Sequence, residues 1–235
     1  MCFNLSLNIR REKFEKVFGV DPGREWGPGF LLSAFDYPVF PLVGVFDGRM
    51  EVREGNWGLI PPWASLDRLT TLRKSTFNAR SEDSWDKPSF KQAMVGGRVL
   101  IPFSGFFEWK TLGKKKVPYF ITFKDRDEVG ALAGLYSKWI GPSGNWETFS
   151  LLTGPPNELM AGIHSRSPIR LEREKWATWL DPKCTKTQVE AVLINSPWVD
   201  MEFYALGDLI NKKGVMRNIP EVLDPQPVDS QQTLF

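Results

Sequence analysis

The stretch RVLIPFSGFFEW, residues 98–109, decides the fold class, because two short apolar runs flank the turn-forming pair Ser104-Gly105. Short runs rich in β-branched and aromatic residues, bounded by such turn residues, are typical of β-strands. Residues 117–123, VPYFITF, alternate and predict a third strand. Two more strands are predicted over residues 131–139 and 146–153, joined by the turn GPSG at 141–144. The centre of the chain is therefore rich in strands.

Helical patterns surround this centre. Phe14, Val17 and Phe18 have helical spacing within residues 11–18, and Gly19 is placed to end that helix. The segment Gly27–Asp47 is rich in Gly, Pro and aromatic residues without a regular period, which favours a loop with short strand pieces. Further helices are predicted over residues 88–95, 155–162, 172–180 and 185–193. Many strands with interspersed helices, and no strict alternation of the two, predict an α+β fold on an antiparallel or mixed sheet.

Length and composition indicate a globular protein. A chain of 235 residues, 42% of them hydrophobic, suits one large domain with a sizeable core. We expect a domain over residues 1–222 and a flexible tail over 223–235, which is rich in Pro, Gln and Ser. The net charge of +2 excludes a strongly basic nucleic-acid binder, so any such contact must come from a local patch. The 10 Trp and 17 Phe residues are compatible with base stacking, although most of these rings should be core.

Cysteine and histidine usage excludes several kinds of site. The chain has two cysteines and one histidine and no CxxC pattern, so we predict no metal site, no disulfide framework and no cofactor. The N-terminus, MCFNLSLNIRREKF, lacks the apolar run of a signal peptide, and no stretch has membrane-spanning length. We therefore expect a soluble cytoplasmic protein that makes no membrane contact.

Cys2 is the residue whose position gives it the most unusual reactivity. Removal of Met1 would give Cys2 a free α-amine, whose pKa of about 7.7–8.0 leaves part of it neutral and nucleophilic near pH 7. Such an amine forms a Schiff base with an aldehyde, and the neighbouring thiol can then close a five-membered thiazolidine. An internal cysteine cannot do this, and the chain that retains Met1 is inert in this chemistry. A buried cysteine without function is the alternative.

Three other segments carry side chains suited to catalysis. His164 is the only histidine and lies in the turn-like sequence GIHSRSP, so proton transfer and a structural role are both open. Glu108 is flanked by Phe107 and Trp109, which predicts partial desolvation and a raised carboxyl pKa, unless strand alternation points it to solvent. Asn78 and Arg80 are two residues apart and share one face if they lie on a strand.

Taken in order, these segments resemble the SOS-response-associated peptidase (SRAP) family. The matching motifs are Met1-Cys2, WGLIP at 57–61, FNARSE at 77–82, RVLIP at 98–102 with GFFEW at 105–109, and IHSRSP at 163–168. The resemblance covers residues 2–215. It implies a β-rich, twisted and barrel-like domain with a positively charged cleft for single-stranded DNA, and suicidal crosslinking to abasic sites. It also implies autoproteolytic exposure of Cys2.

The resemblance also implies residue roles. Cys2 would be the nucleophile, Asn78 would orient groups at the Schiff-base centre, Glu108 would assist proton transfer, and His164 would assist imine chemistry and crosslink reversal. The implied DNA contacts are Arg80 with a phosphate, Trp63 by stacking, and Pro41, Thr153 and Arg166.

The sequence departs from the family pattern near its start. Phe3 and Asn4 follow Cys2 where the family has Gly-Arg, so the expected phosphate-binding arginine is missing. Pro41 is an uncertain match to the family's Asn-x-Ala-Pro, and Ser165 replaces an aspartate. We therefore expect the DNA contacts near the start of the chain to differ from the family pattern.

The C-terminal sequence QQTLF, residues 231–235, fits the pattern Gln-x-x-Leu-Phe and resembles peptides that dock on the bacterial sliding clamp. Gln231, Leu234 and Phe235 would be the clamp contacts, because a tail ending in two apolar anchors is a suitable docking ligand.

Two other functions stay open from the residues. A cysteine hydrolase acting on peptides in trans could use Cys2, His164 and Asn78 as a triad-like set. A non-catalytic module could bind single-stranded DNA through aromatic and arginine side chains. A monomer suits a protein that reacts once with its target.

Overall fold

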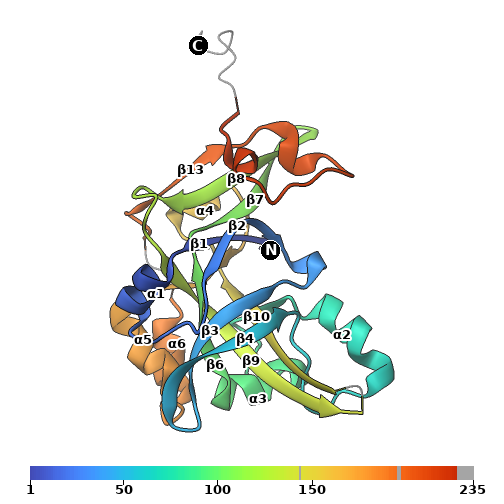
Figure 1. Cartoon of the computed structure of the whole chain (residues 1–235), viewed down its shortest axis with the longest axis vertical. Helices are drawn as coiled ribbons and strands as arrows, with labels where there is room; N and C mark the ends of the chain where they lie inside the picture. Colours follow the sequence, from blue (N-terminus) through green and yellow to red (C-terminus); the bar gives the residue numbers. More distant parts are fainter. Residues whose placement is uncertain (143, 195–196, 227–235) are drawn as a thin grey trace.

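The computed structural model describes residues 1–142, 144–194 and 197–226, and it has an α+β architecture built on two β-sheets (Figure 1). The larger sheet has the strand order β11-β10-β4-β3-β6-β9-β12, and β5 also pairs with β10. Because β10 additionally pairs with β9, strands β4, β3, β6, β9 and β10 close into a ring. Its strands are β3 (Val39–Phe46), β4 (Arg49–Trp57), β5 (Asn78–Arg80), β6 (Arg98–Phe103), β9 (Gly130–Gly141), β10 (Gly144–Gly154), β11 (Ser167–Pro168) and β12 (Arg170–Leu171).

The smaller sheet has the order β13-β8-β7-β1-β2. Its strands are β1 (Asn4–Ile9), β2 (Trp26–Ser33), β7 (Gly105–Leu112), β8 (Lys115–Phe123) and β13 (Met201–Ala205). Pairing is antiparallel in this sheet, while β10 pairs in parallel with β4 and β5, so the predicted mixed, barrel-like β-structure is confirmed.

The chain passes from one sheet to the other at Ser104. Strand β6 ends one residue before it and β7 begins one residue after it. The Ser104 backbone N–H donates to the Ser6 carbonyl (2.8 Å), which ties this corner to β1. Gly105 allows a close approach, since a Cβ there would lie 2.9 Å from the backbone oxygen of Ile121. The pair Ser104-Gly105 therefore changes sheets rather than forming a hairpin within one.

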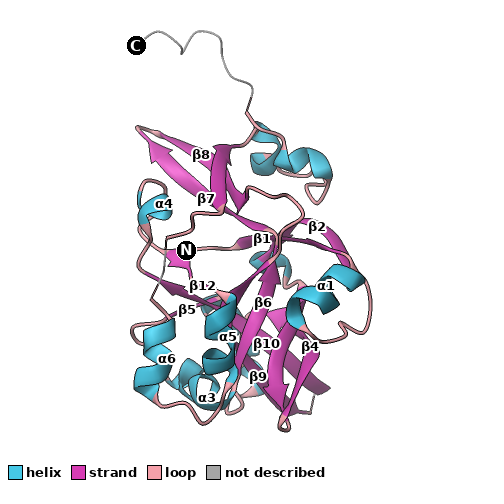
Figure 2. Cartoon of the chain, turned by 90° about the vertical axis from the view of Figure 1, so that its left-hand side faces the viewer, coloured by secondary structure: helices cyan, strands magenta, loops and turns pink. Residues whose placement is uncertain are grey.

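Helices cover the barrel, and α5 packs beside α6 and against β6 (Figure 2). The buried Trp179 indole of α5 donates to the Val99 carbonyl of β6 (2.9 Å). The α-helices are α1 (Arg11–Phe18), α2 (Leu69–Ser75), α3 (Pro88–Gly96), α4 (Glu158–Ala161), α5 (Arg173–Leu180) and α6 (Lys186–Val192). Short 3₁₀ helices are η1 (Ala34–Asp36), η2 (Leu66–Arg68), η3 (Asp208–Asn211) and η4 (Pro220–Leu223).

Most of the predicted elements are confirmed, including the strands over 98–123 and 131–153 and the helix over 11–18, which Gly19 ends in the left-handed conformation (φ 74°). The loop predicted for Gly27–Asp47 is wrong, because the segment contains the long strands β2 and β3. β2 has shifted register against β1, and β3 is buried on both faces, so neither strand shows a period of two. The helix predicted over 155–162 is a single turn.

Candidate active site at the N-terminus

The N-terminus lies between the two sheets, as both ribbon views show (Figures 1 and 2). Strand β1 pairs antiparallel with β7, with Leu5 opposite Phe106 and Ser6 opposite Gly105. Residues before Leu5 therefore run alongside residues after Phe106, which brings the first residues toward Glu108. The Cys2 side chain is fully buried, and its Sγ donates weakly to the Asn4 carbonyl at 3.5 Å.

Asn78 reaches Cys2 from the barrel. It lies on β5, which pairs in parallel with β10, so that Asn78 is opposite Leu151. Its Nδ2 donates a hydrogen bond to the Cys2 carbonyl oxygen at 2.8 Å. Its Oδ1 is buried without a hydrogen-bond partner among the described residues. An unpaired buried acceptor is costly, so this oxygen is available to a group that enters the site.

Two titratable side chains converge on the α-amine of Met1. His164 Nε2 lies 3.0 Å from the amine nitrogen, and Glu108 Oε1 forms an ion pair with it at 3.4 Å. His164 Nδ1 lies 3.0 Å from the backbone nitrogen and 3.1 Å from the carbonyl oxygen of Arg166. Nδ1 therefore has a partner in either tautomer, so Nε2 can act as donor or acceptor toward the amine.

Burial sets the protonation of the acid and of the thiol. The Glu108 side chain is only 5% exposed, and this desolvation raises its pKa against the opposing effects of the Met1 amine and His164. The predicted desolvation of Glu108 is therefore confirmed. Burial, together with the nearby Glu108 carboxylate, raises the pKa of the Cys2 thiol far above its usual range. While Met1 is present, Cys2 is thus a protonated and poorly nucleophilic thiol.

A pocket of 420 Å³ opens beside these residues. Asn78 and Arg80 both line it, which confirms that they share one face, and Lys74 lies beside them. No carboxylate of the described residues lies within ion-pair distance of Arg80 or Lys74. The complete lining is Met1, Phe3, Lys74, Ser75, Phe77, Asn78, Arg80, Lys87 and Phe90. Cationic and aromatic side chains thus surround Met1 and Asn78 in this pocket.

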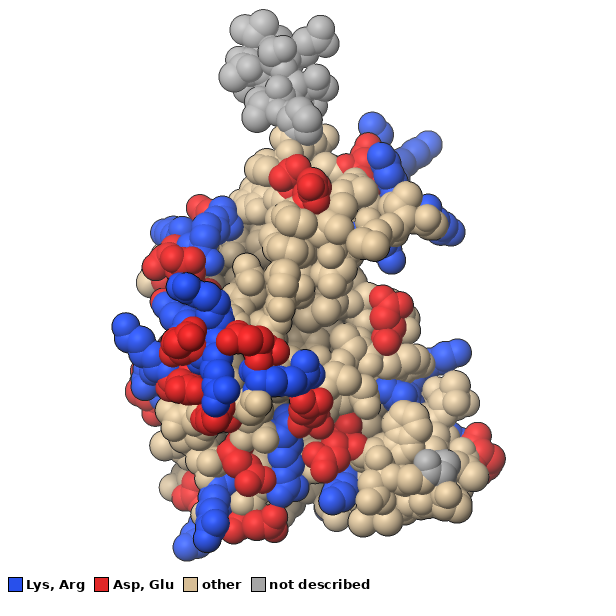
Figure 3. All heavy atoms as spheres, in the orientation of Figure 1, with Lys and Arg blue, Asp and Glu red and all other residues tan. Residues whose placement is uncertain are grey.

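Charge is otherwise mixed over the surface. On the face in Figure 3, Lys and Arg are interspersed with Asp and Glu at the left, and the centre is largely uncharged. The surface is hollowed at the right, and both cationic and acidic side chains border the hollow. This face therefore carries no continuous basic surface.

Arg166 holds the loop that carries His164. Its guanidinium makes a bidentate ion pair with Glu82 (2.7 and 2.9 Å) and donates to the Thr153 carbonyl oxygen at 2.7 Å. These hydrogen bonds lower the pKa of Glu82 to about 2. Since the Arg166 backbone contacts the His164 ring, the ion pair fixes the ring as well as the loop. Glu82 lies within the FNARSE motif, but the sequence assigned it no role, because only the fold places it beside Arg166.

Replacement of Glu82 by Gln should lower the thermal unfolding midpoint at neutral pH. Because the pKa of Glu82 in the folded state, about 2, lies below the ordinary 4.5, its stabilisation is complete above pH 4.5 and is lost as the pH falls toward 2. We expect on the order of 1 kcal/mol, since solvent screens the half-exposed carboxylate. Unfolding midpoints of the wild type and Glu82→Gln, measured across this pH range, should converge at the acidic end.

Glu54→Gln is the matched control, because the Arg24–Glu54 ion pair is half-exposed on both sides (51% and 54%) and holds no loop of the site. It should change the unfolding midpoint little at any pH. A constant difference between Glu82→Gln and the wild type from neutral to acidic pH would contradict the proposed coupling.

The remaining predicted DNA contacts occupy different environments. Trp63 is 51% exposed, and its indole donates to the Pro88 carbonyl (3.2 Å), next to Lys87 of the pocket. Pro41 is buried within β3, at a position where β3 pairs with β4 but not with β6. Thr153 has no exposed surface and its hydroxyl contacts the Ala79 carbonyl (3.3 Å). In this conformation only Trp63 of the three presents its side chain at the surface.

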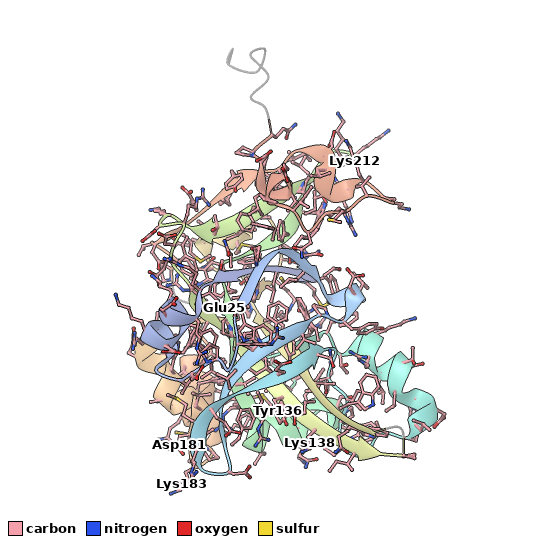
Figure 4. All side chains as sticks on the ribbon, in the orientation of Figure 1. Glu25, Tyr136, Lys138, Asp181, Lys183 and Lys212 are labelled. Carbon is pink, nitrogen blue, oxygen red and sulfur yellow. The ribbon has the colours of Figure 1, made fainter. Side chains whose placement is uncertain are left out.

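A second pocket, of 260 Å³, lies between α3 and β9 and is lined by Tyr136 and Lys138. Figure 4 places these two residues at the lower end of the barrel, away from the N-terminus.

The described residues contain no cluster of three or more His, Cys, Asp or Glu side chains suited to a metal ion. None of the helices in the described ranges combines the length and apolar character needed to cross a bilayer.

Comparison with known proteins assigns the family. The model of the family described as SOS response associated peptidase (SRAP) matches residues 1–213, so the chain belongs to the SRAP family. Among individual relatives, it is 34% identical over 232 residues to the abasic site processing protein YoqW of Bacillus subtilis (strain 168), with 95% of this chain and 99% of that protein covered. It is 30% identical to the abasic site processing protein HMCES of Gallus gallus, covering 72% of this chain and 56% of that protein.

Solved structures show the same fold. A crystal structure of a protein from Bacteroides thetaiotaomicron matches with a TM-score of 0.83 and 30% identity, and covers 96% of this chain and all of that one. A protein from Bordetella bronchiseptica shares the fold with a TM-score of 0.76 at 21% identity. The predicted resemblance and the predicted fold class are both confirmed.

Proposed function

We propose that this protein processes abasic sites in single-stranded DNA by forming a covalent crosslink through Cys2 once Met1 has been removed. The observation that supports this most directly is the environment of the Met1 amine, which contacts His164 at 3.0 Å and Glu108 at 3.4 Å. Asn78 holds the Cys2 carbonyl oxygen, so Cys2 stays anchored next to these groups when removal of Met1 frees its amine. Relatives named abasic site processing proteins point to the same substrate.

The reaction joins the protein to the open-chain aldehyde of the lesion. The neutral Cys2 amine attacks the aldehyde carbon, and the resulting carbinolamine loses water to give an imine. The Cys2 sulfur then adds to the imine carbon, and the thiol proton goes to the nitrogen. One C–N and one C–S bond form, the C=O bond is lost, and one water is released. The thiazolidine shields the strand because the aldehyde is no longer free.

The surrounding side chains have separate roles in this reaction. Glu108, whose pKa is raised by burial, supplies a proton to the departing water and assists opening of the deoxyribose. His164 exchanges protons with the amine through Nε2, and its two partners on the Arg166 backbone accommodate either tautomer. Asn78 orients the nucleophile through the Cys2 carbonyl, and its free Oδ1 is an acceptor for the sugar.

The same side chains that line the pocket form the DNA contact. Arg80 and Lys74 bind backbone phosphates as charged donors without competing carboxylates nearby. Trp63, half-exposed beside the pocket, stacks on a base. Arg166 is already paired with Glu82, so we assign it to positioning His164. Thr153 supports this arrangement, because its carbonyl oxygen accepts a hydrogen bond from the Arg166 guanidinium. Pro41 supports the barrel behind the site rather than touching DNA directly.

A peptidase that acts in trans is less well supported. A hydrolytic triad needs the histidine to activate the thiol, yet in the described part of the chain His164 contacts the Met1 amine and Arg166 rather than Cys2 Sγ. Asn78 binds the Cys2 carbonyl and not the imidazole. The same groups around the Met1 amine are suited to self-processing at that residue.

The test mixes protein lacking Met1 with single-stranded oligonucleotides that contain one abasic site or none, and separates the products on a denaturing gel. The proposal expects a slower-migrating band with the abasic oligonucleotide only. Each protein molecule should crosslink to at most one oligonucleotide. Absence of this band, or turnover of peptide substrates with no DNA adduct, would rule the proposed function out.

A second proposal concerns binding of the replication sliding clamp by the C-terminus. Gln231, Leu234 and Phe235 lie outside the described residues, so this proposal rests on the Gln-x-x-Leu-Phe pattern alone. Deletion of residues 231–235 should abolish clamp binding, measured by surface plasmon resonance, because both apolar anchors are lost. Crosslinking should be unchanged. Unaltered clamp affinity after the deletion would reject the motif.

A further inference from the structure

An exposed aromatic ring lies at the rim of the N-terminal pocket. Phe35 is 63% exposed, more than any other phenylalanine or tryptophan side chain of the described residues. Its ring centroid is 5.2 Å from that of Phe3 and 5.4 Å from that of Phe77. Phe3 and Phe77 both line the pocket beside Asn78. The exposed ring is therefore continuous with the wall of the proposed active site.

The local backbone holds this ring in place. Phe35 lies in η1, the short 3₁₀ turn that connects β2 to β3. The Ala34 backbone N–H donates to the Phe3 carbonyl oxygen (2.8 Å), and the Tyr37 N–H donates to the Ala34 carbonyl oxygen (3.1 Å). Tyr37 in turn packs against Phe77, with centroids 5.6 Å apart. A ring fixed from behind loses little conformational entropy when a ligand stacks on its outer face.

The charges near this ring indicate what kind of partner it accepts. Lys74 and Arg80 line the same pocket as Phe3 and Phe77. Arg73 stacks over the Tyr37 ring at 4.0 Å, which extends the cationic character toward η1. An apolar protein segment would leave these three cationic side chains unpaired, whereas a nucleotide offers both a π-face and a phosphate.

We propose that Phe35, backed by Phe3 and Phe77, is a stacking platform for an unpaired base next to the lesion. The proposal rests on the proposed function only in that the ligand is single-stranded DNA. Base recognition by stacking tolerates any sequence, because every base has a π-face.

The test measures non-covalent binding, so that its outcome does not depend on the crosslinking reaction. One oligonucleotide carries a single tetrahydrofuran analogue of the abasic site, which has no aldehyde, flanked by normal bases. The second has tetrahydrofuran at the flanking positions as well, which removes the bases and keeps the phosphates. Phe35→Ala should weaken binding of the first about tenfold, the size of one base–aromatic stack, and leave binding of the second unchanged.

Two variants complete the design. Phe35→Trp should restore binding of the base-flanked oligonucleotide, since indole stacks at least as well as phenyl. Phe203→Ala, at an exposed phenylalanine of β13 (43%), is the matched control and should bind both oligonucleotides like the wild type. If Phe35→Ala loses the same affinity for both oligonucleotides, or loses none for either, Phe35 is not a stacking platform. Absence of any crosslink to an aldehyde-bearing site would instead reject the proposed function.

Discussion

Replacement of Cys2 by Ser should abolish the stable crosslink while leaving an imine that borohydride can trap. Serine keeps the N-terminal amine and its neighbours, so the first step proceeds, but the hydroxyl is a far weaker nucleophile than the thiol. Formation of the stable adduct should fall to background, because the hydroxyl oxygen attacks from the same position as the sulfur but is intrinsically a much poorer nucleophile near neutral pH. Denaturing gels with and without borohydride measure the two outcomes separately.

Cys184 provides the matched control for this variant. It is the second free cysteine, lies partly exposed beside Asp181, and belongs to none of the residues around Met1. Cys184→Ser should therefore crosslink at the wild-type rate. Equal amounts of a stable, borohydride-independent adduct in Cys2→Ser and in the wild type would contradict a role for the thiol in closing the ring.

Insertion of one alanine between Met1 and Cys2 should be equally damaging. After removal of Met1, this chain has an alanine where the wild-type precursor has Met1, so its amine occupies the site beside His164 and Glu108. The fold should be undisturbed, but the thiol and the amine no longer share a residue, and a five-membered ring cannot form. We expect the stable adduct to fall to background on the denaturing gel.

Two measurements separate this effect from a loss of folding. The inserted chain should unfold at the wild-type temperature and should bind the tetrahydrofuran oligonucleotide with wild-type affinity. A heat-stable adduct formed by the inserted chain at the wild-type rate would show that an internal cysteine or a lysine is sufficient, which contradicts the account.

The strands around residues 98–123 were predictable because their signals are local. Apolar runs of strand length, with Ser104-Gly105 between them, specify β6 and β7 without reference to the rest of the chain. The same holds for α1, where apolar residues at helical spacing precede Gly19. Strands β2 and β3 were not predictable in this way, since β2 pairs with β1 in a shifted register and β3 is buried on both faces, with the distant β6 as one of its partners.

The candidate site likewise combines features that the local sequence predicts with features that depend on the fold. Each of Cys2, Asn78, Glu108 and His164 could be selected from its local chemistry and from an ordered series of motifs. Their convergence depends on long-range pairing, because β1 meets β7 while β10 brings β5 and β11 together. The pairing of Arg166 with Glu82 depends on that same convergence. This is why a residue expected to contact DNA proves to be held by a carboxylate.

The local sequence left the burial of both Glu108 and Cys2 open. Flanking aromatic residues are a local signal of desolvation, and the Glu108 carboxylate is indeed buried. The complete burial of the Cys2 side chain results from its position between two sheets, which residues 1–4 alone do not encode. That burial raises the pKa of the Cys2 thiol.

The most direct test of the central claim is intact-mass analysis of the crosslink, followed by fragmentation of the DNA-linked peptide. The account predicts a mass equal to the chain without Met1 plus the abasic oligonucleotide minus one water, formed without borohydride, with the attachment at Cys2. Attachment at Lys74 or Lys87 of the pocket, or an adduct that retains Met1, would contradict it.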